Sequence, residues 1–201
     1  MKTLILIILL LSVHLIFPQN NSLQISQDGI FAERYITNSP VLDFLTAFDD
    51  TLFQYDIEKH TVCKINFDFN FDGILDIALT DHYLWGAHIG PWEIYLRIEN
   101  NKYLCVGGLW FHNDAIKIDS LSDGNSKILV FDRAGGANVD IAEYLLSNEN
   151  IKEIKRNSLQ FEDFEGMNAA FKEYKFQSLK DSCINVQDYI NSKKIEWKDL
   201  Y

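Results

Sequence analysis

This 201-residue chain has few of the residues that are typical of a linker between domains. Proline occurs three times, at positions 18, 40 and 91, and no long low-complexity segment interrupts the chain. The composition therefore gives no sign of a domain boundary. About 180 residues follow the N-terminal apolar segment described below, enough for one domain with a proper hydrophobic core.

Sequence motifs that mark several enzyme classes are also missing. The chain has no G-x-S-x-G, no H-E-x-x-H and no cysteine in a recognisable protease setting. Carboxylates are so abundant that their number gives no argument for a glycosidase. These absences favour a non-catalytic protein. A secreted hydrolase with its site on the aromatic loop 81–92, near His112, is an alternative.

Basic residues are too few to balance the acidic ones. The chain has 18 Lys and Arg against 29 Asp and Glu, and without Lys2 the remainder has 18 − 1 = 17 against 29, a net charge of −12. Such an acidic chain is a poor partner for nucleic acid and for anionic membrane surfaces. It suits a protein that attracts cations, or a periplasmic inhibitor or immunity-type protein that masks a basic enzyme.

The N-terminus has the pattern of an export signal. Lys2 precedes an apolar run over residues 4–17, which is shorter than the roughly 20 residues of a membrane span. No cysteine lies near the end of this run, which argues against a lipid anchor. We expect a signal peptide over 1–22, whose cleavage site the sequence does not fix, and a single exported domain over 23–201 with no membrane span. An uncleaved N-terminal anchor is the alternative.

One stretch, residues 68–76, has the spacing of a metal-binding loop. Oxygen-bearing side chains stand at its positions 1, 3, 5 and 9, and glycine stands at position 6, where a sharp turn is needed. Calcium takes about six to eight oxygen ligands. The predicted ligands of a structural Ca²⁺ are the side chains of Asp68, Asn70, Asp72 and Asp76 and the backbone carbonyl of Ile74. A metal-free acidic β-turn is the alternative, because Asp, Asn and Gly favour turns.

The residues before and after this loop show which of two kinds of calcium loop it resembles. The EF-hand has a bidentate Glu at position 12, inside an outgoing helix, whereas position 12 here is Leu79. Residues 61–67 and 74–79 both have the pattern of strands. Strand, acidic loop and strand over residues 62–80 resemble the FG-GAP or VCBS-type repeat of integrin-α-like and secreted bacterial proteins. The resemblance implies binding or adhesion, toward an unknown protein or carbohydrate ligand.

A second, degraded copy of the loop pattern occupies residues 119–124. Its offset from the first copy, 119 − 68 = 51 residues, is plausible for such a repeat. The second copy lacks most of the side-chain ligands, so we assign no metal to it.

The rest of the chain predicts a mainly β fold. Residues 92–99 alternate apolar and polar side chains, which predicts one buried face, and Asn100-Asn101 then offers a hairpin turn. Short turns favour an antiparallel meander, similar to propeller blades but too small for a closed propeller. Helices are expected over 40–53, 161–175 and 186–192. Strands are expected over 61–67, 74–79, 92–99, 103–111, 115–118, 127–132, 138–146 and 151–155.

Histidines and cysteines permit several interpretations. His82, His88 and His112 lie on or near the aromatic loop, but their spacing matches no zinc motif. His60 is expected at the surface. Export permits a disulfide, and one between Cys63 and Cys105 that leaves Cys183 free is one possibility. Three buried thiols are the alternative.

Overall fold

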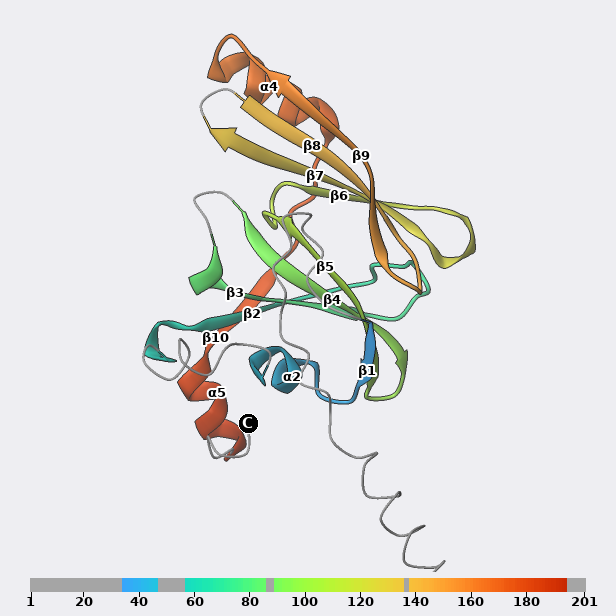
Figure 1. The fold of residues 1–201 in the computed structure, drawn as a ribbon, viewed down its shortest axis with the longest axis vertical. Helices are drawn as coiled ribbons and strands as arrows, with labels where there is room; N and C mark the ends of the chain where they lie inside the picture. Colours follow the sequence, from blue (N-terminus) through green and yellow to red (C-terminus); the bar gives the residue numbers. More distant parts are fainter. Residues whose placement is uncertain (1–33, 47–56, 86–88, 136–137, 195–201) are drawn as a thin grey trace, which may run out of the picture.

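The computed structural model describes residues 34–46, 57–85, 89–135 and 138–194 (Figure 1). Its strands form two antiparallel sheets, neither of which closes on itself, with a short N-terminal helix and C-terminal helices. The predicted mainly β fold class is therefore confirmed. The predicted signal peptide and the second half of the predicted helix 40–53, residues 47–53, lie outside the described residues.

Each sheet contains four consecutive strands joined as a meander. The six-stranded sheet has the order β1 (Tyr35–Thr37), β5 (Lys102–Phe111), β4 (Gly90–Glu99), β3 (Asp76–Asp81), β2 (Thr61–Phe67) and β10 (Asp181–Asn185). The four-stranded sheet has the order β6 (Ile116–Ser120), β7 (Ser126–Gly135), β8 (Asn138–Leu146) and β9 (Ile151–Gln160). All eight predicted strands are present. The edge strands β1 and β10 were not predicted.

The two sheets pack face to face and helices cover their outer faces (Figure 1). The central core joins residues of both sheets, among them Trp92 and Ile94 from β4 with Ile128 and Tyr144 from the second sheet. Helices α2 (Pro40–Thr46) and α5 (Val186–Lys193) cover the other face of the six-stranded sheet. Helix α4 (Phe164–Tyr174) covers the other face of the four-stranded sheet through Met167 and Phe171. No helix of the described segments combines the length and apolar composition needed to cross a membrane.

Strand β4 is buried on both faces, so the expectation of one buried face was wrong there. Trp92, Ile94 and Leu96 point into the central core as predicted. Their neighbours Glu93 and Tyr95 are also buried, because α2 and α5 cover the face that was expected to meet water. The sequence pattern shows the alternation but not the helices that lie over it.

Glu93 lies in a small polar network between the six-stranded sheet and the helices α2 and α5. Its Oε2 accepts a hydrogen bond of 2.5 Å from the hydroxyl of Tyr95, whose oxygen lies 3.1 Å from the hydroxyl oxygen of Tyr35. Burial raises the pKa of Glu93 from 4.5 to about 7, and the hydrogen bond from Tyr95 opposes part of this rise. The folded state therefore favours the protonated form of Glu93.

The disulfide joins Cys63 on β2 to Cys183 on β10, so neither of the two alternatives, a Cys63–Cys105 pair or three free thiols, is present. Cys105 lies on β5, three strands away from β2 in the sheet, or about 14 Å at the usual spacing. It also belongs to the core on the opposite face. Burial keeps the pKa of the free Cys105 thiol well above its usual range. The disulfide is compatible with an oxidising, extracytoplasmic location.

We predict that Glu93→Gln makes the protein more stable at high pH. Because folding raises the pKa of Glu93, its contribution to stability is complete below about pH 4.5 and is lost as the pH rises through about 7. Glutamine keeps an acceptor for Tyr95 and stays neutral. The variant should gain up to about 3 kcal/mol over the wild type at pH 8.5 relative to pH 4.5, measured by urea unfolding.

The matched control is Glu99→Gln, which changes an exposed glutamate at the end of the same strand. It should follow the pH dependence of the wild type. Parallel curves for the wild type and Glu93→Gln would show that Glu93 is charged in the folded protein.

Candidate functional site

Residues 68–75 connect β2 to β3, and Asp76 is the first residue of β3. The strands pair from Phe67 opposite Asp76 to Val62 opposite Asp81. The predicted order of strand, acidic loop and strand is therefore correct. Two residues of the loop have positive φ, Phe71 at 57° and Gly73 at 87°. Gly73 adopts a positive φ without steric cost, as the sequence predicted. The positive φ of Phe71 was not predicted.

The loop carboxylates hold the turn through its backbone amides. Asp68 accepts hydrogen bonds from the amides of Asp72, at 3.0 Å, and Gly73, at 2.9 Å. Asp72 accepts from the amide of Ile74 at 2.8 Å and from the side-chain amide of Asn70 at 3.0 Å. The turn is thus ordered by the same side chains that were predicted to bind the ion.

Asp76 fixes the loop to the neighbouring strand. It is fully buried, and its two oxygens accept from the amide of Phe69, at 2.9 Å, and of Arg97 on β4, at 2.8 Å. Burial raises the pKa of Asp76 to about 7; the two hydrogen bonds oppose this rise, and the nearby charges of Asp72 and Asp68 add to it. A cation at the loop would offset this crowding of negative charge.

The donor set of the loop fits a hard cation. All the predicted ligand atoms are oxygens, which calcium prefers. Each of the three carboxylates accepts two hydrogen bonds, and a carboxylate has about four acceptor positions, so capacity for an ion remains. Within the described ranges, none of the three forms an ion pair with a basic side chain. Ile74, whose carbonyl is the fifth predicted ligand, is 42% exposed.

The three loop carboxylates lie near one another, but their oxygens are not gathered as closely as metal ligands in this structure. In the described part of the chain, one group of His, Cys, Asp and Glu has its ligand atoms within 4.8 Å of one another, and it consists of Cys63, His82, Asp181 and Cys183. The carboxylates of the loop face separate backbone amides instead. Binding an ion would have to draw them together.

The degraded copy of the loop has the equivalent place in the second meander. Residues 119–124 cover the end of β6 and most of its connection to β7, much as residues 68–76 cover the β2–β3 connection and the first residue of β3. Asp119 forms an ion pair of 3.3 Å with Lys117, and Gly124 has a φ of 70°. The ion pair leaves Asp119 less suited to a metal, in keeping with the absence of the other ligands.

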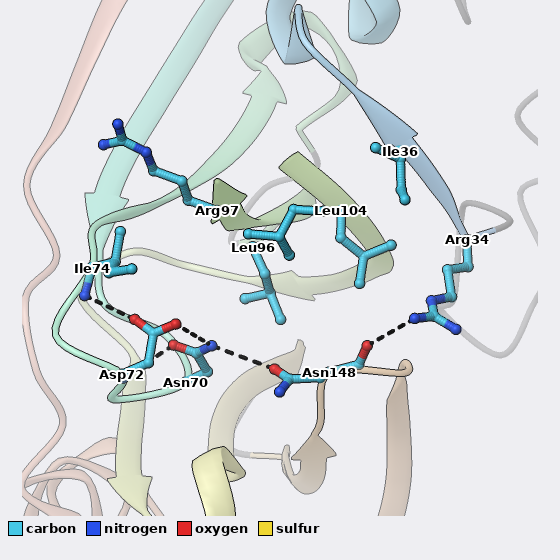
Figure 2. Close-up of a pocket in the computed structure, with 10 residues that line it drawn as sticks. Arg34, Ile36, Asn70, Asp72, Ile74, Leu96, Arg97, Leu104 and Asn148 are labelled. Atoms are coloured by element: carbon cyan, nitrogen blue, oxygen red, sulfur yellow. Dashed lines mark hydrogen bonds between the residues drawn. The ribbon is translucent and has the colours of Figure 1, made fainter. Parts of the chain in front are cut away.

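A groove of about 350 Å³ adjoins the calcium-loop candidate (Figure 2). Asn70 and Asp72 form one side of it, Arg34 the other, and Asn148 of the β8–β9 turn joins them. The side-chain amide of Asn70 donates to Oδ1 of Asn148 at 3.4 Å, and Arg34 donates to the backbone carbonyl of Asn148 at 3.3 Å. The remaining lining residues are Ile36, Ile74, Leu96, Arg97, Ile98 and Leu104.

The aromatic loop brings two of the three histidines together. The rings of His82 and His112 pack on Trp85, with centroids 4.5 and 5.7 Å from it, and His88 lies outside the described residues. Each histidine has its own carboxylate at 4.0 Å, Asp181 for His82 and Asp114 for His112. Trp85 itself packs on the central core, as a loop that folds its aromatic residues inward would do.

His60 is buried, so its expected place at the surface was wrong. It is 3% exposed and forms a short contact with the fully buried Asp81, while Tyr83 packs against its ring. Asp81 also accepts from the amides of Thr61 and Tyr83. This pair fixes the start of β2 to the end of β3. The sequence does not predict this contact, because a single histidine before a strand has no pattern that indicates burial.

Sequence reasoning also missed the groove and the Cys-His-Asp group. Arg34 and Asn148 are 114 residues apart and meet only through the packing of the two sheets. Cys63 and Cys183 meet through the pairing of the unpredicted strand β10. Comparison of the chain with protein-family models, curated proteins and solved structures finds no match.

We predict that Gly90→Ala destabilises the protein by about 1–3 kcal/mol. A Cβ at position 90 would lie 2.1 Å from Nε1 of Trp85. The indole has little freedom to move, because Nε1 donates to Thr80 at 3.0 Å and the ring packs between His82 and His112. Urea unfolding measures the loss, and the near-ultraviolet circular dichroism should change with it.

Gly166→Ala is the matched control, since the nearest atom to its Cβ would be 3.4 Å away. It should unfold within about 0.5 kcal/mol of the wild type. If Gly90→Ala is equally harmless, Trp85 does not occupy the space above Gly90.

Proposed function

We propose that this chain is an exported calcium-binding module that binds a protein or carbohydrate ligand and performs no catalysis. The observation that carries the proposal is the sharing of side chains between the loop and the groove. Asn70 and Asp72 belong to the candidate ion site and also line the groove. An ion that fixes these two residues would fix one wall of the surface that meets the ligand.

The organisation of the chain supports a repeat-type module. Each sheet contains a four-stranded meander, and the strands that follow the two loops, β3 and β7, begin 126 − 76 = 50 residues apart. One loop retains its carboxylates, and the other has lost most of them. We therefore keep the FG-GAP or VCBS-type resemblance as part of the proposal.

The groove has the features of a ligand contact rather than a catalytic pocket. Apolar side chains are part of its lining, with Ile36 57% exposed and Ile98 41% exposed, and Arg34 lies at one side. Large exposed apolar side chains beside a few polar groups are typical of surfaces that bind partners. With calcium bound, the charge of Asp72 would be offset, so Arg34 would favour a ligand with an anionic group.

We predict that calcium stabilises the wild type and not Asp68→Ala or Asp72→Ala. An ion that binds only the folded state adds about 2.7 kcal/mol at 100 times its Kd. For a protein of this size, that corresponds to a rise in Tm of about 5–10 °C. Differential scanning fluorimetry in EDTA and then in millimolar calcium measures it.

Asp119→Ala is the matched control, because it removes one carboxylate from the degraded loop and changes the net charge equally. It should keep the full calcium response. A Tm of the wild type that does not change with calcium would show that the loop is an acidic turn without an ion. Loss of the calcium response in Asp119→Ala would indicate a general effect of charge.

We further predict that Ile36→Asp weakens ligand binding and keeps the calcium response. Binding to arrays of peptides and acidic oligosaccharides is compared in calcium and in EDTA. A charge at this apolar lining position should weaken binding of any ligand that the arrays identify by at least about tenfold. Ile154→Asp, on the exposed strand β9 at 52% exposure, is the matched control. If Ile36→Asp and Ile154→Asp bind the ligand equally well, the ligand does not bind in the groove.

A further inference from the structure

The cross-strand disulfide lies within a group of four side chains that ligate metals. Cys63, His82, Asp181 and Cys183 each offer one ligand atom, and these atoms lie within 4.8 Å of one another. They come from three elements: β2, the short 3-10 helix η2 (His82–Leu84) and β10. The group shares no residue with the calcium-loop candidate.

The backbone holds this group in place independently of the disulfide bond. Cys63 and Cys183 are direct partners in the antiparallel pairing of β2 and β10, with Cα atoms 4.0 Å apart. Nε2 of His82 lies 4.0 Å from Oδ2 of Asp181, and that oxygen lies 3.7 Å from Sγ of Cys183. The imidazole of His82 is oriented by its packing on Trp85.

We propose that reduction of the Cys63–Cys183 disulfide converts this group into a binding site for one zinc ion. Two thiolates, one imidazole and one carboxylate are a set of four ligands that zinc accepts in tetrahedral geometry. Thiolate sulfur favours zinc over the hard cations that an all-oxygen loop would take. The oxidised and the metal-bound forms exclude each other, because the sulfurs bonded to each other in the disulfide are not thiolates.

The reduction needs two electrons, which a dithiol supplies. One reductant sulfur attacks Sγ of Cys183, which is on the exposed side of the bond, and Cys63 leaves as the thiolate. The second reductant sulfur then displaces Cys183 as a thiolate, and the reductant leaves as a cyclic disulfide. The protons of the dithiol pass to solvent. Zinc then binds the two thiolates together with His82 and Asp181.

The site would be partly enclosed, as closed structural zinc sites are. Cys63 is fully buried in the central core, while the side chains of Asp181 and His82 are 24% and 44% exposed. Zinc can therefore enter from the side of β10, the edge strand of the six-stranded sheet. All four positions of a tetrahedral ion would be filled by the protein, which favours a structural role over a catalytic one.

The experiment compares the oxidised and the reduced full chain. The protein is treated with excess dithiol, freed of it under anaerobic conditions and checked for its fold by circular dichroism. It is then titrated with zinc against a chromophoric chelator, in excess calcium. Cobalt(II) serves as the spectroscopic probe, since thiolate ligands give charge-transfer bands and tetrahedral geometry gives intense d–d bands.

Reduced wild type should bind one zinc per chain at least about 100-fold more tightly than the oxidised protein. Zinc should also protect Cys183 from alkylation, measured by mass spectrometry. His82→Ala and Asp181→Asn should each weaken binding by at least about tenfold, and Cys183→Ser should abolish it. Cys105→Ser, which removes the buried free thiol, should bind zinc as the reduced wild type does.

Three results would overturn the proposal. The first is equal zinc affinity of the reduced and oxidised chains. The second is unchanged affinity in both His82→Ala and Asp181→Asn, which would leave only a nonspecific pair of thiolates. The third is a reduced chain that loses its fold and does not recover it with zinc, because metal binding and folding are coupled at a true site.

Discussion

The face-to-face packing of two four-stranded meanders is the constraint on which the rest of the structure depends. Trp92, Ile94 and Leu96 of β4 fill the space between the sheets with residues of β7 and β8. This packing uses only one face of each sheet, and the other faces also carry apolar side chains that need cover. Helices α2 and α5 cover the first sheet and α4 covers the second. The polar network around Glu93 is a consequence of that covering.

The candidate ion loop is positioned by both sheets. Asp76 ties it to β4 through the amide of Arg97, and Asn70 ties it to the second sheet through Asn148. The conformation of the loop therefore depends on the packing of the two meanders as well as on the ion. An ion that draws its carboxylates together would act directly on the contact between the sheets, which gives a physical reason for calcium to have a structural role.

Local patterns in the sequence were sufficient for the eight meander strands and for the loop, because alternation and turn chemistry act between neighbours in the chain. They were insufficient for β1 and β10, which are three and five residues long and exist through pairing with β5 and β2. The same holds for Cys183 and Arg34, whose partners lie more than 100 residues away. Burial of Glu93 and His60 likewise depends on elements that only the folded chain brings over them.

The bond between Cys63 and Cys183 spans a sequence separation of 120 residues and encloses most of the described chain, including both loops, all but the first strand of the two meanders and helix α4. A protease that cut any one surface turn inside this span would open the polypeptide without releasing a fragment. The two pieces would stay joined through β2 and β10 and through the core between the sheets. A molecule nicked in this way would thus keep its shape.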